Sequence, residues 1–129
     1  GLLGRWQVLS QQPLVIADTG HNEAGIQEVL TQLRATPYNH LHMVIGMVND
    51  KDISTVLGML PKDATYYFSR ANIPRALPAN ELQAAAGLQG LTGNTYETVA
   101  EALQAAKNKA AQGDLILVGG STFTVAEVV

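Results

Sequence analysis

Apolar residues along this chain gather in four short runs, separated by longer segments of mixed polarity. The runs are Leu14–Ala17, Leu41–Met47, Thr65–Phe68 and Leu115–Val118. Each has a length typical of a strand, and none alternates cleanly between apolar and polar positions. Parallel strands covered by helices on both faces require such near-continuous apolarity. We therefore predict four buried parallel strands and a further edge strand over 5–9.

The segments between these runs carry apolar residues at helical spacing. Residues 26, 29, 30 and 33 share one side of a helix, and residues 99, 102, 103 and 106 do the same in a later segment. Pro61 and Gly87 mark the ends of two shorter helical segments. The predicted helices are 23–34, 52–60, 79–86 and 98–111, with 123–129 as the start of a further helix that is cut short.

This alternation of strands and helices predicts an α/β fold. The expected architecture is a Rossmann-like, doubly wound and mostly parallel sheet with helices on both faces. The chain has no internal repeat, low-complexity tract or linker, so residues 1–129 are predicted to form one domain. In such sheets, ligands bind at the carboxyl ends of the strands.

Composition narrows the class of protein. The 129 residues are 47% hydrophobic and 15% charged, and the net charge of -3 gives no general attraction for nucleic acid. The absence of cysteine excludes disulfides and thiolate metal sites. The sequence shows no signal peptide and no apolar run approaching the roughly 20 residues of a membrane span. We expect a soluble, cytoplasmic protein.

Polar residues are concentrated where the first apolar run ends. Asp18, His21 and Asn22 follow that run directly and precede the first predicted helix. At the carboxyl end of a strand, such groups and the free N–H groups of the helix can meet phosphate or carboxylate chemistry. The alternative is a local interpretation, in which these residues only stabilise the backbone next to them: Asp18 or Asn22 caps the helix and His21 closes the turn.

Four motifs, in order along the chain, resemble the C-terminal domain of folylpolyglutamate synthases and dihydrofolate synthases, within the Mur ligase superfamily. They are GRWQ at 4–7, DTGHN at 18–22, NDKD at 49–52 and LVGGSTF at 117–123. The family usually has Pro-Gly-Arg-Phe in the first motif and Asp-Gly-Ala-His-Asn-Pro in the second. Here Thr19-Gly20 replaces Gly-Ala and Glu23 replaces the last proline, which leaves Asp18, His21 and Asn22 in register.

The resemblance implies which residues contact ATP phosphates. Arg5 would reach the phosphates with a planar guanidinium suited to bidentate contacts, and Asn22, Asp50 and Lys51 would lie near them. Each has a local alternative as well. Arg5 could be a solvated surface charge, and residues 50–52 could be a solvated turn, with Asp52 or Ser54 capping the next helix.

The resemblance also implies a glutamate side of the site. Asp18 and His21 would be catalytic and would line the cleft between nucleotide and glutamate, and Ser121 would help to hold the glutamate. Alternatively, Gly119 and Gly120 form a tight turn with Ser121 as a helix cap. In the parent enzyme, Asp18→Ala or His21→Ala is expected to lower turnover far more than stability.

The implied reaction is an ATP-dependent amide ligation. ATP and Mg²⁺ would phosphorylate a carboxylate of folate or dihydropteroate, and the amino group of L-glutamate would attack the acyl phosphate. The sequence has no Gly-x-x-x-x-Gly-Lys-Ser/Thr loop, which the family needs to bind ATP. We therefore expect an N-terminal ATPase domain outside this chain, an inactive isolated domain and a monomeric parent enzyme.

Two alternatives remain open on the sequence. The chain could be the corresponding domain of a peptidoglycan-building Mur ligase, or a non-catalytic Rossmann-like nucleotide-binding or interaction domain. We predict no metal site, because His40 and His42 lack partners at metal-ligand spacing and are expected at surface or edge positions. The methionines at 43, 47 and 59 are predicted to fill the core.

Overall fold

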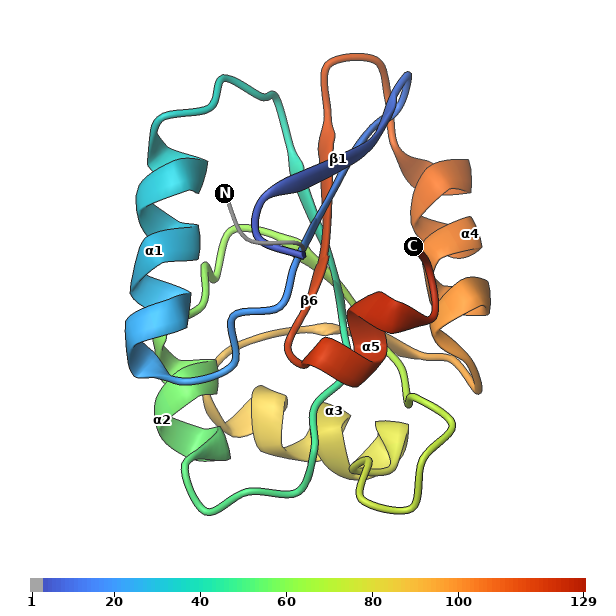
Figure 1. The fold of residues 1–129 in the computed structure, drawn as a ribbon. Coiled ribbons are helices and arrows are strands. Elements are labelled where there is room, and N and C mark those ends of the chain that lie inside the picture. The colour runs from blue at the N-terminus through green and yellow to red at the C-terminus, as the bar shows by residue number, and fades with distance from the viewer. Residues whose placement is uncertain (1–3) are drawn as a thin grey trace.

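Strand and helix alternate along the chain in a computed structural model that describes residues 4–129 (Figure 1). Residues 1–3, which the predicted domain includes, lie outside the described part. The strands are β1 Gln7–Gln11, β2 Leu14–Asp18, β3 Leu41–Ile45, β4 Thr65–Phe68, β5 Gly93–Thr95 and β6 Leu115–Gly119. The helices are α1 Glu23–Arg34, α2 Ile53–Met59, α3 Ala79–Leu88, α4 Val99–Lys109 and α5 Thr122–Ala126.

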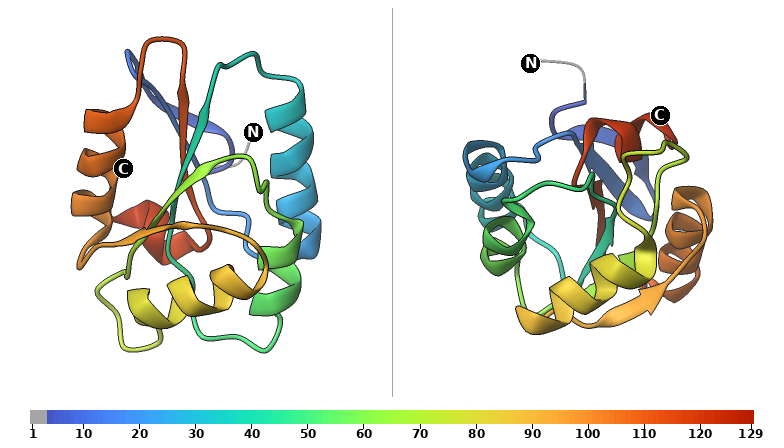
Figure 2. Two further views of the ribbon diagram at one scale, coloured as in Figure 1. Left: turned by 180° about the vertical axis from the view of Figure 1, so that it is seen from behind. Right: turned by 90° about the horizontal axis from the view of Figure 1, so that it is seen from below.

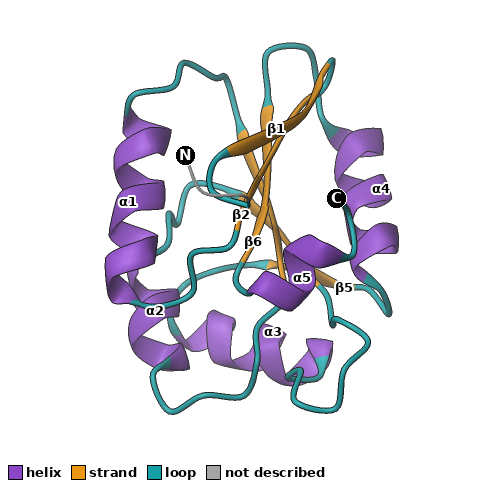
Figure 3. Ribbon diagram, viewed as in Figure 1, coloured by secondary structure: helices purple, strands orange, loops and turns teal. Residues whose placement is uncertain are grey.

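The strands form one six-stranded sheet in the order β1-β2-β6-β3-β4-β5 (Figure 3). Only β1, at one edge, is antiparallel to its neighbour; the other strands are parallel. The last strand, β6, is inserted between β2 and β3, and Gly119 pairs with both Asp18 and Ile45. The carboxyl ends of three strands that are distant in sequence therefore meet at one place.

Helices cover both faces of this sheet, as predicted. Helices α1, α2 and α3 pack on one face through a large apolar cluster that includes Ile26, Leu57 and Leu82. Helix α4 packs on the other face, against a second cluster around Val44 and Ile116. Figure 2 shows this arrangement from two further directions. The fold is the expected Rossmann-like α/β fold. No helix in residues 4–129 has the length and apolar character of a membrane span.

Most element bounds shift by one or two residues from the sequence prediction, and a few differences are larger. The edge strand begins at Gln7 because Trp6 has a φ of 44°, which breaks extended backbone. β3 ends at Ile45, although Met47 stays buried. The short strand β5 was not predicted, because its sequence Gly-Asn-Thr has little strand character. A helix is present where one was expected over 123–129, but it spans Thr122–Ala126 and so does not continue to Val129.

Candidate functional site

An open pocket of about 530 Å³ lies at the carboxyl ends of the central strands. Its lining includes His21 and Asn22 after β2, Met47 and Asp50 after β3, and Gly120 after β6. Three of the four motifs found in the sequence thus meet around one cavity. Because the first residues of α1 also line it, the pocket faces the free N–H groups and the positive dipole end of that helix.

Asn22 forms the start of α1. Its side-chain oxygen accepts a hydrogen bond from the N–H of Gly25 at 2.9 Å, and Glu23 places a negative charge in the first turn. The local interpretation of Asn22 as a helix cap is therefore confirmed. The exposed side chain also lines the pocket.

Asp18 is buried, with 3% of its surface exposed, and both of its oxygens are engaged. Oδ1 accepts from Nε of Arg5 at 2.9 Å and from the N–H of Gly20 at 2.7 Å. Oδ2 accepts from the N–H of Trp6 at 2.8 Å. The carboxylate therefore ties the segment before β1 to the loop after β2, and it does not line the 530 Å³ pocket.

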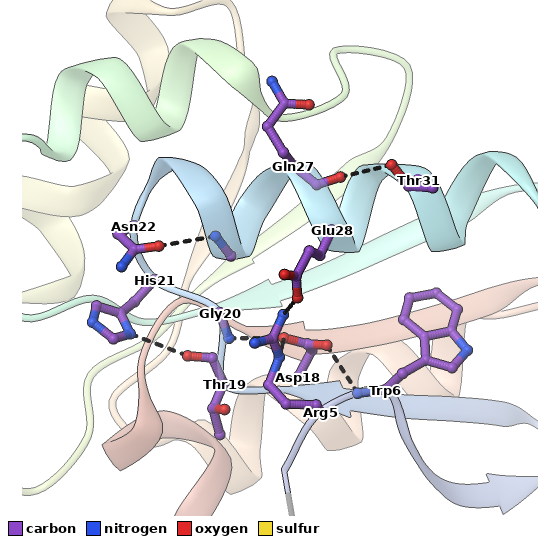
Figure 4. A network of polar contacts seen from close by, with 11 residues as sticks. Arg5, Trp6, Asp18, Thr19, Gly20, His21, Asn22, Gln27, Glu28 and Thr31 are labelled. Carbon is purple, nitrogen blue, oxygen red and sulfur yellow. Dashed lines mark hydrogen bonds and ion pairs between the residues drawn. The ribbon is translucent and has the colours of Figure 1, made fainter. Parts of the chain in front are cut away.

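Arg5 lies between two carboxylates, as Figure 4 shows. Besides its bond to Asp18, it donates from Nη2 to Oε2 of Glu28 on α1 at 2.6 Å. The side chain of Arg5 is 28% exposed and that of Glu28 is 68% exposed. Arg5 is therefore not a freely solvated charge, and it does not line the pocket in this conformation. No motif in the sequence indicated Glu28.

His21 is exposed at the rim of the pocket. Its Nδ1 lies 3.2 Å from the carbonyl oxygen of Thr19 (Figure 4), and a bond between them requires Nδ1 to carry the proton. The imidazole is thus positioned by one local contact and remains accessible to a ligand.

The turn after β3 is solvated, as its local interpretation predicted. Asp50, Lys51 and Asp52 are all exposed. Asp50 Oδ1 accepts from the N–H of Asp52 at 3.1 Å, whereas Asp52 makes no side-chain capping bond to α2. Asp50 and Asp52 line the pocket, but Lys51 does not.

The loop after β6 brings Ser121 to the start of α5. Gly120 has a φ of 105°, and a Cβ there would lie 2.5 Å from the carbonyl oxygen of Gly46. Ser121 is 3% exposed; its Oγ accepts from the N–H of Thr124 at 3.0 Å and shares a hydrogen bond with the Thr124 hydroxyl. The helix-cap interpretation of Ser121 is confirmed, and Gly120 is the residue of this turn that lines the pocket.

A second polar cluster lies at the opposite end of the sheet and corrects the prediction for His42. That side chain is buried on β3, with Nδ1 2.8 Å from the hydroxyl of Tyr67 and Nε2 2.9 Å from Asp114. The hydrogen bond from His42 holds the pKa of Asp114 below its usual range, and burial raises the pKa of Tyr67 to about 12. His42 was expected at the surface because its partners are 25 and 72 residues away.

A known sequence family matches the part of the chain that contains these motifs. The sequence family described as Mur ligase, glutamate ligase domain, matches residues 4–122. The chain belongs to the Mur ligase family, as its glutamate ligase domain. The match covers the first three motifs, all but the last residue of the fourth, and every strand of the sheet.

The relatives of this Mur ligase domain include folate enzymes. It is 36% identical over 129 residues to the dihydrofolate synthase/folylpolyglutamate synthase of Escherichia coli, covering 98% of this chain and 30% of that protein. It is 35% identical over 127 residues to a probable bifunctional folylpolyglutamate synthase/dihydropteroate synthase of Haloferax volcanii, covering 96% of this chain and 15% of that protein. The chain therefore spans less than a third of either relative.

Solved structures share the fold of this Mur ligase domain. The Escherichia coli FolC complex with DHPP and ADP superposes with a TM-score of 0.88 at 36% identity, over 98% of this chain and 30% of that one. A bifunctional folylpolyglutamate synthase/dihydrofolate synthase with Mn, AMPPNP and L-glutamate bound gives 0.89 at 31% identity, over 99% of this chain and 31% of that one. Within residues 4–129, no three His, Asp or Glu side chains are grouped so that they could hold a metal ion.

Proposed function

We propose that this domain is the glutamate side of a longer ATP-dependent ligase that attaches L-glutamate to dihydropteroate, folates or both. The observation that carries this proposal is the match of residues 4–122 to the glutamate ligase domain, with three of its motifs around one pocket. The relatives named as folate synthases favour folate substrates. Other members of the Mur ligase family remain the alternative, so a peptidoglycan precursor must be tested as well.

The proposed reaction has two steps. The γ-phosphoryl group of ATP passes to a carboxylate of the folate-side substrate, which gives ADP and an acyl phosphate. The amino group of glutamate then attacks the acyl carbon, phosphate leaves and the nitrogen loses a proton, which yields an amide. Holding the two reactants in line and stabilising the transferred charge are the contributions that a protein site makes to such steps.

The pocket offers groups suited to anionic reactants. The amino-terminal end of α1 supplies N–H groups and a favourable dipole, and Asn22 and His21 add hydrogen-bonding side chains at the rim. In this proposal, His21 lies beside the incoming glutamate, where its accessible imidazole could accept a proton. Asp50 and Lys51, in the exposed turn, would approach the nucleotide from the other side.

The roles proposed for Asp18 and Ser121 are limited by the hydrogen bonds that their side chains already make. Both side chains are buried and already hydrogen-bonded, so direct contact with glutamate would require an existing bond to break. Asp18 can act without such a change by holding Arg5, which would reach the ATP phosphates. Ser121 can act through the shape of the loop that brings Gly120 into the pocket.

Part of the proposed site must come from elsewhere in the polypeptide. The 129 residues contain no phosphate-binding loop, and the described residues offer no cluster for Mg²⁺. We propose that an N-terminal ATPase domain supplies both, and that closure of the two domains in a cytoplasmic, monomeric enzyme completes the site. A structure of one relative carries Mn and AMPPNP, which is consistent with a metal–nucleotide substrate.

The test uses the full-length parent protein. ADP release from ATP and Mg²⁺ is measured with glutamate plus dihydropteroate or a reduced folate, and this chain alone serves as the control. ADP release that depends on both glutamate and the pterin substrate, with a silent control, is expected. Activity only with a nucleotide-linked peptidoglycan precursor would move the protein to the other branch of the family. The absence of any ATP turnover would favour a non-catalytic domain.

A further inference from the structure

The guanidinium of Arg5 is held by two carboxylates that differ in their surroundings. Asp18, which binds Nε, is 3% exposed and is fixed by two backbone N–H groups as well. Glu28, which binds Nη2, is 68% exposed. Removing one partner from a buried ion pair is costly, whereas an exposed pair is weak and exchanges easily. The bond to Asp18 is therefore the fixed one, and the bond to Glu28 is the exchangeable one.

Glu28 does not line the pocket. Helix α1 enters the pocket with its first residues, including Glu23. Glu28 follows five residues later, about 7.5 Å further along the helix axis at 1.5 Å per residue. Figure 4 shows Arg5 reaching α1 beside Glu28, with His21 and Asn22 in a separate part of the view. The Glu28 contact thus holds the terminal nitrogen of Arg5 against a residue outside the pocket lining.

We propose that Glu28 is a positioning residue that competes with the nucleotide phosphates for Arg5. In the nucleotide-free protein, Glu28 holds Nη2 along α1. When a nucleotide enters, the phosphates displace Glu28, and the guanidinium turns about its bond between Nε and Asp18. This inference rests on the proposed function, in which Arg5 contacts the ATP phosphates, and adds to it a competitor within the chain.

The exposure of Glu28 sets how strongly it can weaken nucleotide binding. A pair between an exposed carboxylate and a guanidinium is worth little, which corresponds to roughly a 1.5- to 5-fold effect on a binding constant. Screening by salt should reduce that effect, because Glu28 is in contact with solvent. A bond of this strength keeps Arg5 ordered without closing the site to nucleotide.

The experiment measures binding of AMPPNP with Mg²⁺ to the full-length protein by calorimetry, together with KM for ATP and kcat. Glu28→Gln is expected to tighten AMPPNP binding and lower KM for ATP by roughly 1.5- to 5-fold, with kcat unchanged. The gain should shrink as salt rises from about 0.05 to 0.5 M. Glu81→Gln, which removes an equal exposed charge from α3, is the matched control and should leave binding unchanged.

A second pair of variants tests whether the effect passes through Arg5. In an Arg5→Ala background, Glu28→Gln should no longer change the Kd for AMPPNP. Unchanged or weaker binding in Glu28→Gln would overturn the competition, as would a gain that persists without Arg5. If the unsubstituted protein binds no nucleotide, the proposed function and the competition fail together. If the unsubstituted protein binds nucleotide normally and Glu28→Gln has no effect, the competition is refuted and the proposed function stands.

Discussion

Asp18 and His21 differ in burial and hydrogen bonding, although substitutions at both were expected to affect turnover far more than stability. His21 is exposed and makes one long contact to Thr19, whereas Asp18 is buried and accepts three hydrogen bonds. We now expect Asp18→Ala to unfold the domain more easily as well as to impair any activity. His21→Ala should leave stability nearly unchanged.

The cost of Asp18→Ala can be worked out from the three lost bonds. The N–H of Gly20 is buried and would be left without its partner, which costs about 1–3 kcal/mol. The N–H of Trp6 and the guanidinium of Arg5 are only part-buried and can be rehydrated, so each adds about 0.5 kcal/mol. The expected loss in the free energy of unfolding is about 2–4 kcal/mol. His21→Ala should cost less than about 0.5 kcal/mol.

Urea denaturation of residues 1–129 provides the assay. At the urea dependence typical of small domains, the expected loss lowers the midpoint by roughly 1–2 M. Trp6, the only tryptophan, sits in the segment that Asp18 holds, so its fluorescence reports that segment directly. Circular dichroism reports the helices. In Asp18→Ala, the fluorescence transition should come at lower urea than the circular dichroism transition, because the segment before β1 detaches first.

His21→Ala is the matched control for this measurement. If Asp18→Ala and His21→Ala have the same midpoint, the three hydrogen bonds do not stabilise the fold and the reasoning is wrong. Coincident fluorescence and circular dichroism transitions in Asp18→Ala would show that the loss is global and not confined to the first segment.

Three further predictions concern the core, the second polar cluster and the pocket turn. Ile16→Ala should cost about 2–5 kcal/mol in urea denaturation of the chain, while turnover per folded molecule of the parent enzyme is retained. The hydrogen bond from His42 lowers the pKa of Asp114, so the stability that Asp114 contributes is present above about pH 4 and is lost as pH falls through its folded pKa. Acid titration followed by circular dichroism should therefore show a smaller stability difference between wild type and Asp114→Asn below pH 4 than at pH 7. Gly120→Ala should lower the melting temperature and the turnover of the parent enzyme, because the backbone has a φ of 105° and the new Cβ would meet Gly46.

Long elements with a strong pattern were predictable from the sequence. Helix α1 has the predicted bounds, Glu23–Arg34, since its apolar spacing, its Asn22 cap and its last-turn arginine all indicate the same segment. The strand β5 was missed because its place depends on a neighbouring strand. A Cβ at Gly93 would collide with the carbonyl oxygen of Tyr66, so close approach, and not strand propensity, selects that residue.

The candidate site was predictable only in part, for a related reason. The motifs could be found and ordered along the chain, and local chemistry identified the helix caps at Asn22 and Ser121. The partners of buried charges could not be found in this way. Glu28 is 23 residues from Arg5, and Asp114 is 72 residues from His42. No local pattern connects such pairs.

The sequence by itself determined the α/β class, the main helices, four of the five parallel strands and the family motifs, because each depends on neighbours along the chain. Only the tertiary structure decided that β6 lies between β2 and β3, and hence which motifs share a pocket. It also decided that the Asp18 carboxylate is paired with Arg5 and that Arg5 is turned toward Glu28. Residues distant in the chain meet only after the sheet has formed, and their burial and hydrogen bonds then decide which side chains remain accessible to a ligand.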